Sequence, residues 1–241
     1  MPANVEKRHF ATTRWSIVLA AGGVGRNGCR TALTQLCEIY WYPLYAYVRS
    51  SAGVREAQDL TQSFFAHLLE KRTIGKADHD RGRFRDFLLA SLKNFLANER
   101  QKACAQKRGG KSVRLSLDFA AGESRYQIEP SHALTAENLY ERRWVLTLLD
   151  QVLERLRLEL IQSGNAEHFG QLKGALIGET TAEEYARAAA VLDITPAAAK
   201  QAAYRMRRRF RQLFRQCVAQ TLADESDVDD EISRLLEVLA G

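Results

Sequence analysis

The sequence predicts an all-α protein in which two small helical domains are joined by a flexible linker. Apolar residues recur at three- to four-residue steps along almost every patterned segment, which is the spacing of an amphipathic helix. Only 4 prolines occur in 241 residues, so long helices can run without interruption. The helical spacing stops at residues 106–138, where glycine, proline and polar residues gather, and this gap predicts the linker.

The N-terminal domain is predicted to span residues 30–105, after a short helix and a glycine-rich loop in residues 1–29. Its amphipathic helices are expected at 30–50, 55–71 and 83–101. The loop segment 23–28, GVGRNG, matches the G-x-G-x-x-G pattern of dinucleotide sites. Such a site needs a surrounding βαβ unit, and the segments that follow are patterned as helices. We therefore interpret the segment as a plain loop.

The C-terminal domain is predicted at residues 139–222, and an acidic tail follows at 223–241. Helices are expected at 139–162, 166–177, 181–191 and 196–222, with a tail helix at 224–240. The linker between the domains is expected to hold at most local structure, around residues 115–117.

Residues 181–215 carry the sequence pattern of a helix-turn-helix motif. Asp193 and Ile194 are expected to form its tight turn, because Asp tolerates unusual backbone angles. Thr195 is a good N-cap, and Pro196 suits the first helical position because its missing N–H costs nothing there. The helix that follows begins with small residues and then carries six arginines. This composition predicts a recognition helix that binds DNA.

The composition favours a soluble cytoplasmic protein with a polyanionic partner. The formal net charge is +6 and the isoelectric point is about 9.2. The four cysteines stand at wide spacings that suggest neither a disulfide framework nor a zinc site, so reduced thiols are expected. The sequence shows no signal-like stretch and no long apolar run, so no membrane insertion is expected.

The sequence offers no catalytic constellation. Its five histidines are scattered, and it contains no H-E-x-x-H motif, no carboxylate pair at metal spacing and no G-x-S-x-G motif. His79 stands between Asp78 and Asp80, where a loop of hydrated charges explains the cluster. We therefore expect no enzyme activity, no metal and no cofactor.

Four segments of the chain resemble conserved segments of a known family. They are residues 32–50 (ALTQLCEIYWYPLYAYVRS), 57–65 (AQDLTQSFF), 84–100 (FRDFLLASLKNFLANER) and 192–213. Their order, with a linker after the third, resembles the extracytoplasmic-function (ECF) group of the sigma-70 family of RNA polymerase sigma factors over nearly the whole chain. The resemblance implies a sigma region 2-like bundle, a linker and a sigma region 4-like helix-turn-helix domain.

The resemblance also implies a function, which is to recruit core RNA polymerase to promoters and to help melt the DNA. The second segment resembles the one that docks on the clamp helices of the β′ subunit, and its expected polymerase-binding residues are Asp59, Gln62, Ser63 and Glu70. Contacts with the −10 promoter element are implied for Lys76, Arg81, Arg83, Arg85, Lys93, Asn94, Asn98 and Arg100. Contacts with the −35 element are implied for Thr195, Ala198, Lys200, Gln201, Tyr204, Arg205 and Arg208.

Two positions depart from the family pattern. The position just after D-L-x-Q is often acidic in the family and is Ser63 here, so weaker binding to polymerase is expected. Phosphorylation of Ser63 or of Thr61 would add about 1.5–2 negative charges and is hypothesised to restore docking. Helical phase favours Ser63, and a Ser/Thr kinase or an anti-sigma regulator is a candidate partner. The second departure is Asp193, where the turn of the family commonly has Gly.

Two alternatives stay open. The chain could be a stand-alone helix-turn-helix transcriptional regulator, which would explain residues 181–215 but not the pattern of residues 55–100. The acidic tail is either a plain surface helix or a segment that folds back on the arginine-rich helix and competes with DNA. In the second case, deletion of residues 224–241 would tighten DNA binding at low salt.

Overall fold

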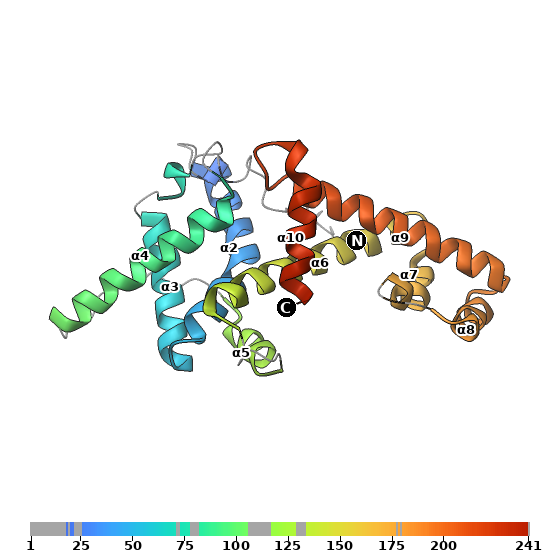
Figure 1. Cartoon of the computed structure of the whole chain (residues 1–241), viewed down its shortest axis with the longest axis horizontal. Coiled ribbons are helices and arrows are strands. Elements are labelled where there is room, and N and C mark those ends of the chain that lie inside the picture. Colours follow the sequence, from blue (N-terminus) through green and yellow to red (C-terminus); the bar gives the residue numbers. More distant parts are fainter. Residues whose placement is uncertain are drawn as a thin grey trace, which may run out of the picture. The chain divides into compact units, whose positions relative to one another are not determined.

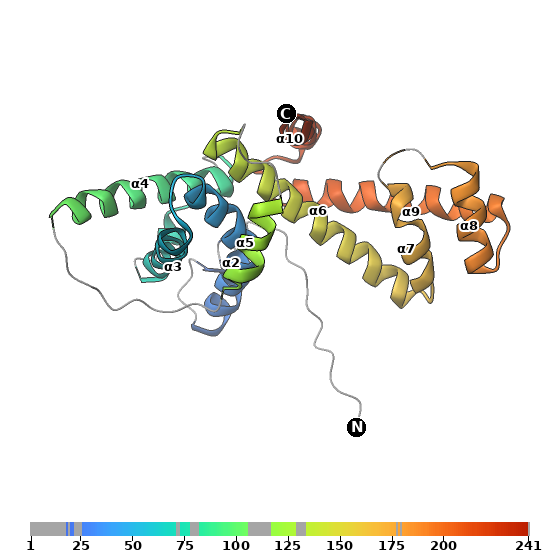
Figure 2. The same cartoon turned by 90° about the horizontal axis from the view of Figure 1, so that it is seen from below.

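The computed structural model describes residues 18, 20–21, 26–70, 73–77, 82–105, 117–128, 134–176, 178 and 180–240. The secondary structure of these residues is helical and contains no strand, which confirms the predicted all-α class (Figures 1 and 2). The α-helices are α2 (Arg26–Arg49), α3 (Val54–Glu70), α4 (Phe84–Ala105), α5 (Phe119–Ile128), α6 (Ala136–Gln162), α7 (Ala166–Leu172), α8 (Ala182–Leu192), α9 (Pro196–Ala219) and α10 (Val228–Ala240). Short 3-10 turns occur at η1 (Thr73–Lys76), η3 (Lys173–Leu176) and η4 (Glu225–Asp227).

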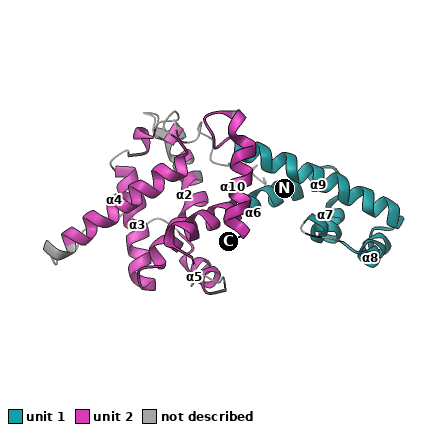
Figure 3. Cartoon of the chain, in the orientation of Figure 1, with its two compact units in different colours: residues 1–10, 148–218 teal, residues 11–147, 219–241 magenta. Residues whose placement is uncertain are grey.

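The chain divides into two compact units, which Figure 3 colours separately. Unit 1 contains residues 148–218, and unit 2 contains residues 11–147 together with 219–241. Helices α6 and α9 each begin in one unit and end in the other. This division differs from the predicted boundaries, because the tail helix α10 belongs to unit 2 with the N-terminal helices. The apolar spacing of α10 predicts a helix but does not reveal the segment on which it packs.

The core of unit 2 is built around α2. Tyr40, Leu44 and Tyr45 of this helix are buried, and the rings of Tyr40 and Phe84 meet edge to face at 5.6 Å. Helix α2 begins at Arg26, so the predicted glycine-rich loop is shorter than expected. Its segment before residue 26 lies mostly outside the described residues.

Helix α5 lies inside the predicted linker and packs on α2, where Figures 1 and 2 both show it. Glu123 of α5 accepts a hydrogen bond of 2.5 Å from the Tyr45 hydroxyl and two of 3.1 Å from the Arg49 guanidinium. The rings of Phe119 and Trp41 meet edge to face at 5.9 Å. These bonds hold the pKa of Glu123 below its ordinary value, chiefly through Arg49. The prediction of a flexible linker is therefore wrong for residues 119–128, which form a packed helix. Residues 106–116 and 129–133 lie outside the described part of the chain.

Gly122 explains why the sequence pattern missed α5. Glycine inside a helix normally weakens it, so Gly122 favoured a loop. In the structure, a Cβ atom at this position would lie 2.8 Å from the six-membered ring of Trp41. The absence of a side chain is therefore what lets α5 approach α2.

We expect Gly122→Ala to lower the free energy of unfolding by about 1–3 kcal/mol, because the added methyl group overlaps the Trp41 ring. Gly170→Ala is the matched control, since Gly170 is helical and has no atom within 4 Å of its ideal Cβ position. This control should raise stability by roughly 0.5–1 kcal/mol, as alanine does in an open helix. Urea unfolding measures both changes. A shift of the same sign in the two variants would contradict the close packing of α5.

Unit 1 is a smaller helical cluster formed by the C-terminal half of α6 and by α7, α8 and most of α9. Its buried apolar side chains are Leu148, Val152, Leu156, Leu172, Ala175, Tyr185, Ala188, Ala189, Ala199, Ala203, Met206, Leu213, Phe214, Cys217 and Val218. None of the helices in the described residues has both the length and the apolar composition that spanning a lipid bilayer would require.

Candidate nucleic-acid interface

Helix α8 starts with a capping box. The Thr181 hydroxyl accepts a hydrogen bond of 3.2 Å from the Glu184 backbone N–H, and the Glu184 carboxylate accepts one of 2.8 Å from the Thr181 N–H. Each side chain satisfies a backbone donor that the helix leaves open. Tyr185, Ala188 and Ala189 are buried, as predicted from their spacing, whereas Leu192, which was also expected to face inward, is half-buried.

The turn after α8 has the predicted geometry. Asp193 lies in the left-handed region, with φ 53° and ψ 46°. The backbone N–H groups of Asp193 and Ile194 both donate to the Ala189 carbonyl, which ends the helix. The Thr195 hydroxyl then accepts a hydrogen bond of 3.2 Å from the Ala198 N–H and caps α9. The predicted tight turn and N-cap are thus confirmed.

Helix α9 has one buried face and one exposed face. Each residue predicted to contact the −35 element is exposed: Thr195, Ala198, Lys200, Gln201, Tyr204, Arg205 and Arg208. Tyr204 is 58% exposed, which is unusual for a large aromatic side chain and leaves its ring free to stack. Among the described residues, no carboxylate pairs with Lys200, Arg205 or Arg208. This exposed face therefore offers cations that no carboxylate of the described residues neutralises.

Arg207 does not belong to this exposed face, because its side chain donates hydrogen bonds to other elements of unit 1. Its Nε donates to the Ala175 carbonyl at 2.6 Å, and its Nη2 donates to the Tyr185 hydroxyl at 2.7 Å. These bonds join α9 to η3 and to α8. Two of the three guanidinium nitrogens of Arg207 are therefore engaged within unit 1.

Arg209 has a similar structural role. Its guanidinium makes two parallel hydrogen bonds, of 2.7 and 2.8 Å, with the Glu159 carboxylate on α6. These bonds hold the pKa of Glu159 below its ordinary value. The arginine-rich helix thus contains two kinds of arginine, which the sequence alone did not separate.

No protein-family model, curated protein or solved structure matches this chain.

The exposed face of α9 extends further than predicted, because Arg211 is exposed three residues beyond Arg208. The signal that could have found Arg211 is the three-to-four-residue step that leads from Tyr204 through Arg208.

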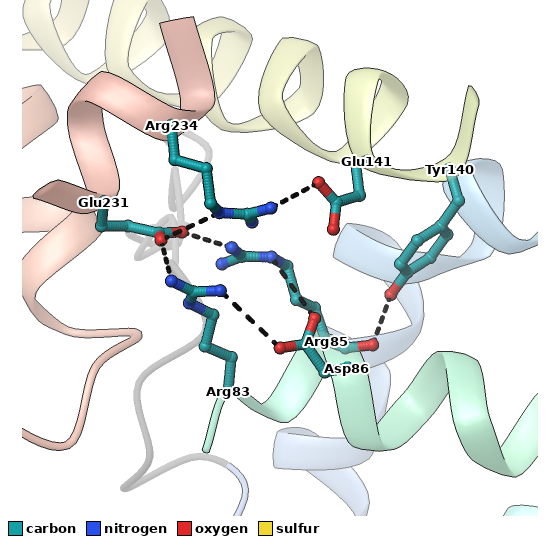
Figure 4. Close-up of polar contacts among 7 residues, drawn as sticks. All are labelled: Arg83, Arg85, Asp86, Tyr140, Glu141, Glu231 and Arg234. Carbon is teal, nitrogen blue, oxygen red and sulfur yellow. Dashed lines mark hydrogen bonds and ion pairs between the residues drawn. The ribbon is translucent and has the colours of Figure 1, made fainter. Parts of the chain in front are cut away.

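The residues predicted to contact the −10 element fall into two groups. Exposed members are Lys76, Lys93, Asn94, Asn98 and Arg100, whereas Arg81 lies outside the described residues. Lys93 forms a surface ion pair of 2.6 Å with Glu137. Arg85 differs from the surface position that was expected: its side chain is 1% exposed and is covered by its ion pair with Glu231 of α10 (Figure 4). Arg83, 33% exposed, pairs with the same carboxylate.

The residues predicted to bind polymerase lie on α3. Asp59 and Glu70 are exposed, and Gln62 and Ser63 are half-buried. Thr61 is fully buried, and its hydroxyl donates to the Ala57 carbonyl at 2.7 Å. A kinase cannot reach this hydroxyl in the folded protein, so the hypothesis of phosphorylation at Thr61 is wrong for this structure. The hypothesis for Ser63 stays a prediction.

Proposed function

We propose that this protein is an RNA polymerase sigma factor of the ECF type, and that α9 reads promoter DNA. The observation that carries the proposal is the exposed basic face of α9. Lys200, Arg205 and Arg208 stand beside the exposed Tyr204 and pair with no carboxylate in the described part of the chain, whereas their neighbours Arg207 and Arg209 are bound within unit 1. Unneutralised arginines and lysines on one helix face are what phosphate and base-edge contacts require.

The polymerase part of the proposal is supported by the resemblance of residues 32–50, 57–65 and 84–100 to the segments that precede the linker in ECF sigma factors. Asp59 and Glu70 are exposed on α3, where the resemblance implies docking on the β′ clamp helices. Such a sigma factor works in the cytoplasm, with core enzyme and promoter DNA as partners.

The test is binding of the full chain to purified core RNA polymerase, followed by transcription from a library of promoter fragments. Tight stoichiometric binding and selective transcription are expected. Asp59→Lys should weaken core binding by at least about tenfold, because a like charge across an interface is costly. Glu167→Lys on α7 is the matched control, as an exposed carboxylate outside α3, and should leave core binding unchanged.

Two results would contradict the proposal. If neither the original chain nor the control binds core enzyme, while the free protein binds a specific duplex with strong salt dependence, the stand-alone regulator is the better description. If Glu167→Lys weakens core binding as much as Asp59→Lys, α3 is not the docking helix.

A further inference from the structure

Glu231 of α10 is a carboxylate buried against arginines from the start of α4. It is 1% exposed, and its two oxygens bind Arg85 and Arg83, the latter at 2.5 Å (Figure 4). Arg234, one turn further along α10, also approaches Glu231, at 3.3 Å. One buried anion thus holds three guanidinium groups together.

Helix α10 is held over this cluster by contacts with the first turns of α6. Arg234 pairs with Glu141 at 2.8 Å, and Arg142 donates to the Leu239 carbonyl at 2.9 Å. The second contact places a cation at the negative end of α10. With the buried Val228 and Leu235, these contacts make α10 a lid on Arg83 and Arg85.

The cluster has more donors than its own acceptors satisfy. Nε and Nη1 of Arg85 are buried and have no hydrogen-bond partner among the described residues, although Arg85 also lies 4.4 Å from the ring of Trp144. The Asp86 carboxylate lies farther away than a hydrogen bond allows, 4.0 Å from Nε of Arg85 and 3.9 Å from Arg83. Unsatisfied guanidinium donors are costly when buried. A ligand with more oxygen atoms than a carboxylate, such as a phosphodiester, would satisfy more of them.

These arginines also stand at the N-terminal end of α4, which begins at Phe84. The Arg83 carbonyl accepts the N–H groups of Asp86 and Phe87, so Arg83 directly precedes the first helical turn. Open backbone donors and the helix dipole favour anions at that end. The buried, unsatisfied nitrogens of Arg85 are an independent sign that the same place suits an anion.

We propose that Arg83 and Arg85 form a binding site for the DNA phosphate backbone, and that Glu231 occupies this site as an internal substitute for phosphate. DNA and α10 then compete for the same two arginines, so the free chain is held in a state of low affinity. The inference rests on the proposed function, since it adds regulation to the arginines expected near the −10 element. It places the competing carboxylate of α10 against the start of α4, not against the arginine-rich helix α9 where tail competition was expected.

The test compares Glu231→Gln with Asp230→Asn in binding to a fluorescent single-stranded oligonucleotide at low salt. Both variants lose one negative charge, but Asp230 is exposed. Glu231→Gln is expected to tighten binding about tenfold, and its plot of log K against log salt should steepen by roughly 0.7 for each phosphate newly contacted. Asp230→Asn should do neither. The gain should disappear when Arg83→Ala is added to Glu231→Gln.

Equal affinities for Glu231→Gln and Asp230→Asn would overturn the proposal, and so would a gain that survives Arg83→Ala. Hydrogen exchange of α10 in the unmodified chain needs no variant: saturating oligonucleotide should speed exchange at residues 228–240, and unchanged protection would refute the competition. If the chain does not bind polymerase but Glu231→Gln binds the oligonucleotide more tightly, the sigma function is wrong and the occluded site is right. If the chain binds polymerase but Glu231→Gln does not bind the oligonucleotide more tightly, the sigma function is right and the occluded site is wrong.

Discussion

Replacing both Arg205 and Arg208 by glutamine is expected to weaken binding to duplex DNA by roughly 30-fold at 0.15 M salt. Each phosphate contact contributes about 0.9 to the slope of log K against log salt, so the loss of two contacts should also lower the slope by about 2. Both side chains are exposed on α9, so the free energy of unfolding should change by less than about 0.5 kcal/mol. Fluorescence anisotropy over a range of salt concentrations measures the affinity and the slope together.

The control is the double substitution Arg207→Gln with Arg209→Gln, which removes the same charge from the same helix. These arginines bind Tyr185 and Glu159 inside unit 1, so their loss should lower thermal stability and leave the salt slope near its original value. If the two double variants lower the slope equally, DNA binding depends on net charge and not on the exposed face of α9.

Replacing Trp144 by alanine is expected to lower the free energy of unfolding by about 3–5 kcal/mol. Trp144 is 1% exposed in unit 2, so its removal leaves a large cavity. Its ring also faces the buried guanidinium of Arg85 at 4.4 Å, and this favourable contact is lost as well. Urea unfolding followed by far-ultraviolet circular dichroism measures the change, since this signal does not depend on the deleted indole.

Trp144→Phe keeps an aromatic face under Arg85 and should cost clearly less, about 1.5 kcal/mol. Tyr204→Ala removes an aromatic ring from the surface of α9 and should change stability by no more than about 0.5 kcal/mol. A loss below about 1 kcal/mol for Trp144→Ala would show that the ring contributes little to the core of unit 2.

The sequence predicted correctly those helix ends and turns whose determining residues lie within a few positions of one another. Helix 181–191 was predicted and α8 is Ala182–Leu192, because its cap and its apolar spacing are both contained within the segment. Asp193 and Thr195 were assigned correctly to the turn and the cap for the same reason. Exposure of the predicted −35 contacts on α9 follows from helical phase alone.

The features that were missed depend on partners far away in the sequence. Glu231 lies 146 residues from Arg85, and no local pattern connects an acidic tail with an arginine at the start of α4. Arg207 and Arg209 differ from Arg208 because other elements supply their hydrogen-bond acceptors, which are Ala175, Tyr185 and Glu159. The separation of structural from available arginines therefore required the tertiary structure.

Unit 2 is built from two separate stretches of the chain, residues 11–147 and 219–241, and the ribosome makes the second stretch much later than the first. Arg85 leaves the ribosome 146 residues before Glu231, a delay of roughly 7–30 s at ordinary rates of synthesis. During that interval the nascent chain carries Arg83 and Arg85 without the carboxylate that later covers them. A chain that stops before residue 231 lacks the carboxylate that pairs with those arginines. Premature termination would thus yield a fragment that binds polyanions more readily than the full chain.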